Sequence, residues 1–195
     1  MTEWWTYGLS DFLMFSPRVY ARLVMGHNEA AWPAQVAALA AGFALLGLTA
    51  RRPSQRLAPL LLLAAAWAAT GWSFHWTRYA DIFLAAPWLA VGCAVQALLL
   101  VAAAFLPTRD ASAARKPGLA LIVAGVLLVP LATALAGQDV RRAEVFALMP
   151  DPTALVTLGW LSATRASPAW SRAALAVLPL LSLLLGIATW VALAQ

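Results

Sequence analysis

The stretch FLAAPWLAVGCAVQALLLVAAAFL, residues 83–106, contains no charged residue and is long enough to cross a lipid bilayer as one helix. A spanning helix needs about 20 predominantly apolar residues, because the hydrocarbon core is about 30 Å thick. Similar runs recur on both sides of this one. Hydrophobic residues make up 63% of the 195 positions, and only 11% are charged, whereas soluble domains are about 45 to 50% apolar. The sequence therefore predicts an all-α fold, a polytopic membrane helix bundle.

Six spans account for most of the chain, and we expect them at about 30–50, 57–76, 83–106, 117–136, 145–164 and 173–195. The fifth is interrupted by Met149-Pro150-Asp151-Pro152, so it is predicted to be broken or partly re-entrant, and five spans is the alternative. Pro179 lies inside the sixth and predicts a kink there, because its ring removes a backbone hydrogen bond. We interpret residues 1–195 as a single integral membrane domain, with 1–29 as an N-terminal interfacial segment and 30–195 as the transmembrane bundle.

A short helix is predicted before the first span. Ser16 can cap its start, Pro17 suits the first helical position, and Gly26 suits its exit. We therefore expect residues 16–26 to form a helix lying along the membrane surface. The N-terminus lacks basic residues ahead of an apolar stretch, so no cleaved signal peptide is expected.

Positive charges are distributed unequally between the predicted loops. One side would hold eight, namely Arg51, Arg52, Arg56, Arg109, Arg115, Lys116, Arg165 and Arg172, and the other side five, namely Arg18, Arg22, Arg78, Arg141 and Arg142. Loops rich in lysine and arginine stay in the cytoplasm. The count predicts that both termini face outward. We therefore interpret the net charge of +5 as a topology signal and not as a sign of nucleic-acid binding.

Acidic residues gather on the predicted outer side. Seven of the eight fall there, namely Glu3, Asp11, Glu29, Asp81, Asp139, Glu144 and Asp151. Such a surface would attract cations. The predicted bilayer centre holds no acid or lysine, so a proton relay of buried acids is not supported.

Most common catalytic signatures are missing from the sequence. It has no P-loop, G-x-G-x-x-G turn, H-E-x-x-H or G-x-S-x-G pattern. Cys93 is the single cysteine, which excludes an intrachain disulfide and a thiolate cluster within the chain. Lys116 is the sole lysine and lies in a predicted loop, which excludes a retinal Schiff base.

Three residues form the candidate metal site: His27, His75 and Asp151. The predicted topology places both histidines at the outer ends of segments, where two imidazoles could bind a metal or a haem iron. Asp151 lies between two prolines that free backbone carbonyls, as the broken helices of transporters do at ion sites. The alternatives are that the histidines only tolerate the interface and that Asp151 is a solvated residue near a helix N-terminus.

The stretches WWTYGLSDFLMFSPRVYARL, HNEAAWPAQ and FALMPDPTALVTLG resemble DUF6064, a bacterial family of multi-pass membrane proteins of unknown function. Trp32-Pro33, His75-Trp76 and the Pro-x-Pro-Thr of residues 150–153 correspond to features of that family. The family pattern has cysteine between these prolines, where this chain has Asp151, which argues against a thiol-based role. The resemblance implies a bacterial cytoplasmic-membrane location and a six-helix plan, and it carries no mechanism.

Three functions fit these observations. The first is a small transporter or permease for a metal cation or small solute, acting as a possible homo-oligomer, with its site on the outer face. The second is a non-catalytic accessory subunit that docks on a larger membrane complex through its tryptophan-rich outer rim. The third is a haem- or metal-dependent membrane enzyme. The lipid bilayer is the expected partner in each case, and the sequence leaves any cofactor unknown.

Overall fold

The computed structural model describes residues 15–107, 113–164 and 167–194, and within them every regular element is a helix. Two of the membrane-length helices contain π-helical turns, named η3 and η5, and two 3-10 turns, η4 and η6, lie in loops. The elements are α1 (Pro17–Ala31), α2 (Ala34–Arg51), α3 (Leu57–Thr70), η3 (Gly71–Trp76), η4 (Tyr79–Asp81), α4 (Ala86–Ala104), α5 (Lys116–Val123), η5 (Ala124–Leu128), α6 (Val129–Leu135), η6 (Val140–Arg142), α7 (Pro150–Ala163) and α8 (Ala169–Leu193). The all-α prediction is confirmed.

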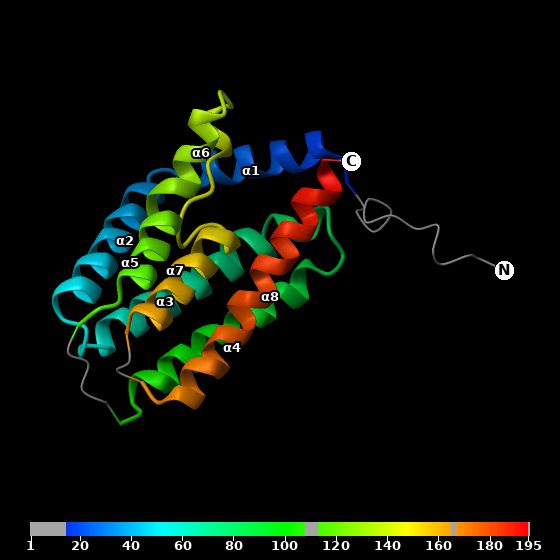
Figure 1. The fold of residues 1–195 in the computed structure, drawn as a ribbon. Helices are drawn as coiled ribbons and strands as arrows, with labels where there is room; N and C mark the ends of the chain where they lie inside the picture. The colour runs from blue at the N-terminus through cyan, green and yellow to red at the C-terminus, as the bar shows by residue number, and fades with distance from the viewer. Residues whose placement is uncertain (1–14, 108–112, 165–166, 195) are drawn as a thin grey trace.

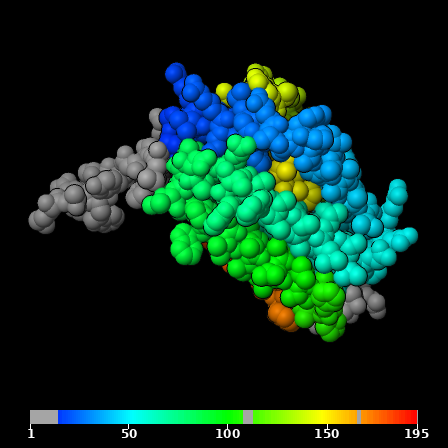
Figure 2. Space-filling model, turned by 180° about the vertical axis from the view of Figure 1, so that it is seen from behind, coloured from blue at the N-terminus to red at the C-terminus, as the bar shows by residue number. Residues whose placement is uncertain are grey.

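Five helical segments are long and apolar enough to cross a membrane. They are Ala34–Arg51, Leu57–Asp81, Ala86–Ala104, Lys116–Leu135 and Ala169–Leu193. These segments run side by side (Figure 1), while α1 lies across one end of the bundle, as both views show (Figures 1 and 2). Large apolar side chains such as Phe43, Leu98 and Leu184 are exposed on their outer faces, as lipid-facing helices require.

The two ends of the bundle are identified by contacts between distant segments. At the α1 end, the ring of Tyr20 in α1 packs edge-on against Trp190 near the end of α8, with centroids 6.3 Å apart. At the opposite end, called here the Arg56 end, the Arg56 guanidinium donates to the carbonyl of Pro107 at 3.2 Å and to Ser167 Oγ at 3.5 Å. These contacts place the predicted odd-numbered loops at one end and α1 with the C-terminal end of α8 at the other.

The fifth predicted span, residues 145–164, is helical only from Pro150 to Ala163. Its helix, α7, has 14 residues, which at about 1.5 Å per residue is too short to cross the hydrocarbon core alone. Residues 143–149 precede it without helical structure, yet Phe146 and Met149 are fully buried. The chain therefore passes between the two ends by a buried irregular segment followed by α7. The break lies at residues 143–149 and not at the predicted 149–152, because Pro150 and Pro152 fit the first turn of α7.

Helix α7 packs between α5 and α8 (Figure 1). Glycines allow its backbone to approach α5 closely. A Cβ at Gly118 would overlap the backbone of Ala163, and one at Gly159 would lie 2.8 Å from the backbone nitrogen of Ile122. Small residues at a helix interface permit this kind of packing in membranes.

The N-terminal helix is longer than the sequence predicted. Ser16 Oγ accepts a hydrogen bond from the Val19 backbone at 3.4 Å, which confirms the predicted start. The predicted end at Gly26 is wrong, because α1 continues to Ala31 and stops only before Pro33. Val24, His27 and Asn28 are buried against the bundle, and this packing outweighs the preference of glycine for a helix exit.

Pro179 lies within α8, as the sequence indicated. Because proline has no N–H, the carbonyl of Leu175, four residues earlier, lacks its helical donor. Gln96 of α4, fully buried, donates its side-chain amide to that carbonyl at 2.9 Å. The carbonyl that Pro179 leaves without a donor in α8 thus accepts a hydrogen bond that joins α4 to α8.

Candidate cation site

The irregular segment 143–149 positions the site. Ala147 has a φ of 65°, in the left-handed region that costs a residue with a side chain about 1 kcal/mol or more. Thr153 in the first turn of α7 stabilises this conformation: its Oγ1 accepts from Ala147 N–H at 2.9 Å and donates to the carbonyl of Met149 at 2.7 Å. The segment is therefore fixed by the helix that follows it.

The loop is also fixed from α1. The Asn28 side-chain amide is buried and donates to the carbonyls of Arg141 and Ala143, at 2.8 and 2.9 Å. One of these carbonyls belongs to Ala143, directly before Glu144. The hydrogen bonds from Asn28 of α1 and from Thr153 of α7 together therefore determine where the Glu144 side chain lies.

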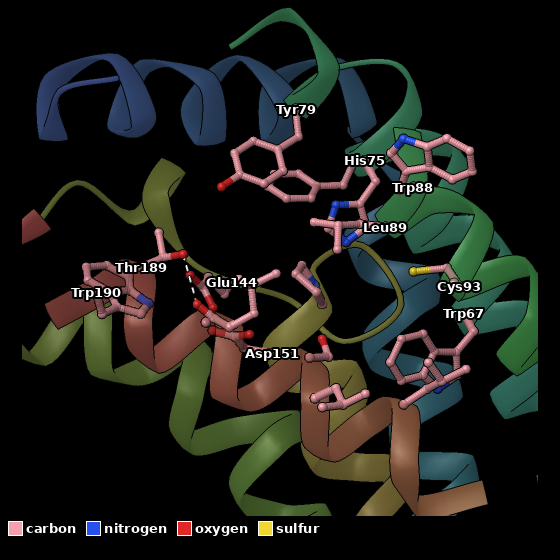
Figure 3. A pocket seen from close by; sticks show the side chains of 18 of the residues that line it. Trp67, His75, Tyr79, Trp88, Leu89, Cys93, Glu144, Asp151, Thr189 and Trp190 are labelled. Carbon is pink, nitrogen blue, oxygen red and sulfur yellow. Dashed lines mark hydrogen bonds between the residues drawn. The ribbon is translucent and has the colours of Figure 1, made fainter. Parts of the chain in front are cut away.

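Two carboxylates, Glu144 and Asp151, lie at the point where two cavities meet. One cavity of about 370 Å³ lies mainly between α4 and α8, and a second of about 580 Å³ lies between α1, α6 and the end of α8. Both carboxylates line both cavities, and Figure 3 shows them from the first one. Among the described residues, no group donates a hydrogen bond or forms an ion pair with either carboxylate.

Aromatic rings surround the carboxylates. Tyr20 of α1, Tyr79 of η4 and Trp190 of α8 line the first cavity with them (Figure 3). Tyr20 packs edge-on against Tyr79 at 6.2 Å and against Trp190 at 6.3 Å. Edge-on packing sets the rings nearly at right angles, so they form separate walls of one chamber.

His75 adds an unpaired imidazole to the same cavity. It lies in the π-helical turn η3, which widens the helix at the site. The side chain is 5% exposed, it lines the cavity, and its Nδ1 has no hydrogen-bond partner in the described structure. Buried polar atoms without partners are rare in proteins, so this nitrogen is a group that a ligand or water could satisfy.

The electrostatics of Glu144 follow from its surroundings. Burial, and to a lesser extent the nearby Asp151 carboxylate, raise the pKa of Glu144 from an ordinary value of 4.5 to about 8. Burial and both carboxylates also raise the pKa of Tyr20. A cation bound beside Glu144 and Asp151 would reduce the repulsion between their negative charges.

The sequence-predicted metal residues are partly brought together. His75 and Asp151 line the first cavity, whereas His27 does not. The imidazole rings of both histidines pack against the ring of Phe74, with centroid distances of 5.5 Å for His27 and 5.2 Å for His75. Burial lowers the pKa of His27, so it is neutral near pH 7. The described residues contain no group of three or more histidine, cysteine, aspartate or glutamate side chains arranged to hold a metal ion, and binding of a metal by these residues stays a prediction.

Glu144 was not singled out by the sequence, where it is one of several outer acids next to two arginines. Its neighbours Arg141 and Arg142 suggest a surface ion pair, but Arg141 pairs with Glu29 at 2.8 Å and with Asp139 at 2.6 Å. One signal was available: Glu144 is the last charge before the apolar residues 145–149, so it enters the bundle with them.

These features define an all-α protein with five membrane-length helices, a buried irregular segment and, at the junction of two cavities, two carboxylates that have no ion-pair partner among the described residues. Residues 18–193 match the family described as "Family of unknown function (DUF6064)". The chain belongs to this family, which confirms the resemblance. Comparisons with curated proteins and with solved structures gave no match.

Proposed function

We propose that the protein is a small transporter or permease of the bacterial cytoplasmic membrane that carries a cation, either a metal ion or a small charged solute. The supporting observation is the pair Glu144 and Asp151 at the junction of two cavities, where Glu144 is buried, Asp151 is partly buried, and neither forms an ion pair within the part of the chain that the structure describes. Isolated buried carboxylates are costly unless they are neutralised or paired. Ionisable groups retained inside a membrane protein are functional candidates for this reason.

The arrangement of the backbone supports the same proposal. Irregular backbone at membrane depth is tolerated where it is buried in protein or lines a cavity, and transporters use such breaks to build ion sites. Residues 143–149 are a break of this kind, with one carboxylate inside them and the other at the start of α7.

We further propose six membrane crossings with both termini outside. The fifth crossing would consist of residues 145–149 and α7, and the arginine count assigns the Arg56 end to the cytoplasm. The cation site would then open on the outer face, because Glu144 lies near the α1 end. Reporter fusions after Gln195 and after Trp76 should both report the periplasm; a cytoplasmic signal after Gln195 would contradict six crossings.

Flux through proteoliposomes tests the transport proposal. Purified wild-type protein is reconstituted, and uptake is measured for Mn²⁺, by quenching of an enclosed fluorophore, and for radiolabelled tetraethylammonium. We expect uptake of at least one of them, reduced about tenfold or more by Asp151→Asn, because the variant loses the charge and keeps the size of the side chain. Asp81→Asn is the matched control, since Asp81 is exposed and lines neither cavity.

The outcomes separate transport from the docking alternative. Uptake by wild type and Asp81→Asn, lost in Asp151→Asn, supports the proposal. If folded wild-type protein admits neither cation above empty liposomes, transport is overturned for both classes, and an accessory subunit becomes the better account.

A further inference from the structure

We propose that the cation carried is an amphipathic organic ammonium, with its charged group at Glu144 and Asp151 and its apolar part in the groove between α4 and α8. This α4–α8 groove is defined by Trp88, Leu89, Gly92, Leu181 and Leu185. The inference rests on the proposed function and specifies its substrate class.

The groove is apolar and opens on the exposed surface of α4 and α8. Trp88 of α4 is 77% exposed and Leu181 of α8 is 55% exposed, yet both line the same cavity as the buried Glu144. The cavity therefore extends from the outer, apolar surface of the bundle to the carboxylates. An apolar chain could enter from the bilayer along this route.

The floor and the width of the groove are set by particular residues. The buried hydrogen bond from Gln96 to the carbonyl of Leu175 joins α4 to α8 beyond the groove. Within it, a Cβ at Gly92 would meet nothing within 4 Å, so the groove has open space at this position. A volume of about 370 Å³ is in the range of small-molecule sites in proteins.

The charged end of the cavity suits a diffuse cation. Tyr20, Tyr79 and Trp190 form walls around the two carboxylates, and ammonium groups bind well over aromatic faces when carboxylates neutralise them. A small metal ion needs several oxygen or nitrogen ligands at short distance. An ammonium group needs only the charge and the ring faces, which is what the described residues provide.

The second cavity gives the charged group a route to the α1 end. It is lined by residues of α1, α6 and the C-terminal end of α8, includes the exposed Gln138 and Arg142, and shares Glu144 and Asp151 with the first cavity. The two carboxylates thus lie between the apolar first cavity and the more polar second cavity. An amphipathic cation has an apolar part that suits the first and a charged part that suits the second.

Calorimetric titration of the full-length protein in nanodiscs tests the inference with three probes: octyltrimethylammonium, tetramethylammonium and neutral 1-octanol. We expect octyltrimethylammonium to bind at least about tenfold more tightly than tetramethylammonium, because burying even two methylene groups is worth that factor. Asp151→Asn should weaken the binding of both ammonium ions and leave the binding of octanol unchanged.

Gly92→Leu provides the second arm, because its side chain would fill open space in the groove without touching the carboxylates. Gly92→Leu should reduce the affinity for octyltrimethylammonium to that for tetramethylammonium, and it should leave the affinity for tetramethylammonium unchanged. Gly47→Leu on α2 is the control, since Gly47 also has open space at its Cβ position and lines neither cavity. If Gly92→Leu melts well below wild type without ligand, Gly92→Val replaces it with a smaller side chain.

The inference is overturned if the two ammonium ions bind equally, if octanol binds as well as octyltrimethylammonium, or if Gly92→Leu and Gly92→Val have no effect. In those cases cation transport still stands wherever proteoliposomes take up Mn²⁺ or tetraethylammonium. Tight, Asp151-dependent binding of octyltrimethylammonium without flux of any cation would instead support the ligand class and overturn the transporter.

Discussion

Gly186 of α8 faces the carboxylate of Asp151 so closely that a Cβ at Gly186 would overlap both carboxylate oxygens. The position of the Asp151 side chain therefore depends on the absence of a side chain on α8. Because Gly186 and Thr189 of the same helix also line the first cavity, any movement of α8 would change the surroundings of the carboxylate (Figure 3).

Replacing Gly186 with alanine should displace Asp151 from its position. We expect cation binding, measured by calorimetry, to weaken about tenfold or more, together with a lower melting temperature, because a buried side chain is forced from its place. The control is Gly47→Ala on α2, where open space surrounds the added Cβ and helix propensity favours alanine by about 1 kcal/mol. Equal behaviour of the two variants would contradict the close contact.

Glu144 should make stability depend on pH. Its pKa is raised to about 8 in the folded protein from 4.5, so the folded state binds the proton more tightly than the unfolded state does. The stabilisation is complete below pH 4.5 and is lost as the pH rises towards 8. The titratable and charged side chains sharing cavities with Glu144 are Tyr20, His75, Tyr79, Cys93, Arg142 and Asp151.

Melting temperatures of wild type and Glu144→Gln measure this effect, since glutamine cannot titrate. The wild type should lose stability relative to Glu144→Gln between pH 5 and 8.5. A difference that stays constant over this range, or one that changes in favour of the wild type, would show that Glu144 is ionised at neutral pH in the folded protein.

Asn28 should tolerate alanine better than aspartate. Its amide donates to two backbone carbonyls, and alanine leaves both without that donor, at a cost of about 1 to 3 kcal/mol. Aspartate has nearly the same shape but presents acceptors to acceptors, so Asn28→Asp should reduce the melting temperature further. The measurement is thermal unfolding in detergent. If the aspartate variant is as stable as the wild type, the loop is not held from α1.

Gln96 and Pro179 should be energetically coupled. Gln96→Leu removes the donor to the Leu175 carbonyl and should cost about 1 to 3 kcal/mol. Pro179→Ala restores a backbone N–H that can bond this carbonyl within α8, so the same Gln96→Leu change should cost less in that background. A double-mutant cycle of the free energy of unfolding gives the coupling. Strict additivity would contradict the compensating role of Gln96.

The sequence predicted the long apolar helices well, because bilayer thickness sets their length and their composition is unmistakable. It predicted an interrupted fifth span but placed the interruption at residues 149–152, whereas the irregular segment is 143–149 and Pro150 and Pro152 lie in the first turn of α7, where proline is tolerated. The end of α1 was missed, since burial of His27 and Asn28 against the bundle lies outside any local signal.

The candidate site could be predicted only in part. Asp151 was found through its two prolines, and His75 through its place at the end of a span. Glu144 was not found, because its burial depends on the path of residues 143–149, which hydrogen bonds from Asn28 of α1 and Thr153 of α7 fix and which no local sequence pattern reveals. His27 was grouped with the site by topology alone, and the structure places Phe74 against it instead.

The central claim is that Glu144 and Asp151 together bind a cation, and chemical labelling tests it most directly. Dicyclohexylcarbodiimide is apolar and adds to protonated carboxyl groups in apolar surroundings, so it should modify Glu144 at pH 7. The modified peptide is identified by mass spectrometry of the full-length protein, with and without Mn²⁺ or octyltrimethylammonium. We predict labelling of Glu144 that a bound cation suppresses at least about tenfold. Labelling that no cation reduces, or that occurs only at exposed acids such as Asp81, would contradict the claim.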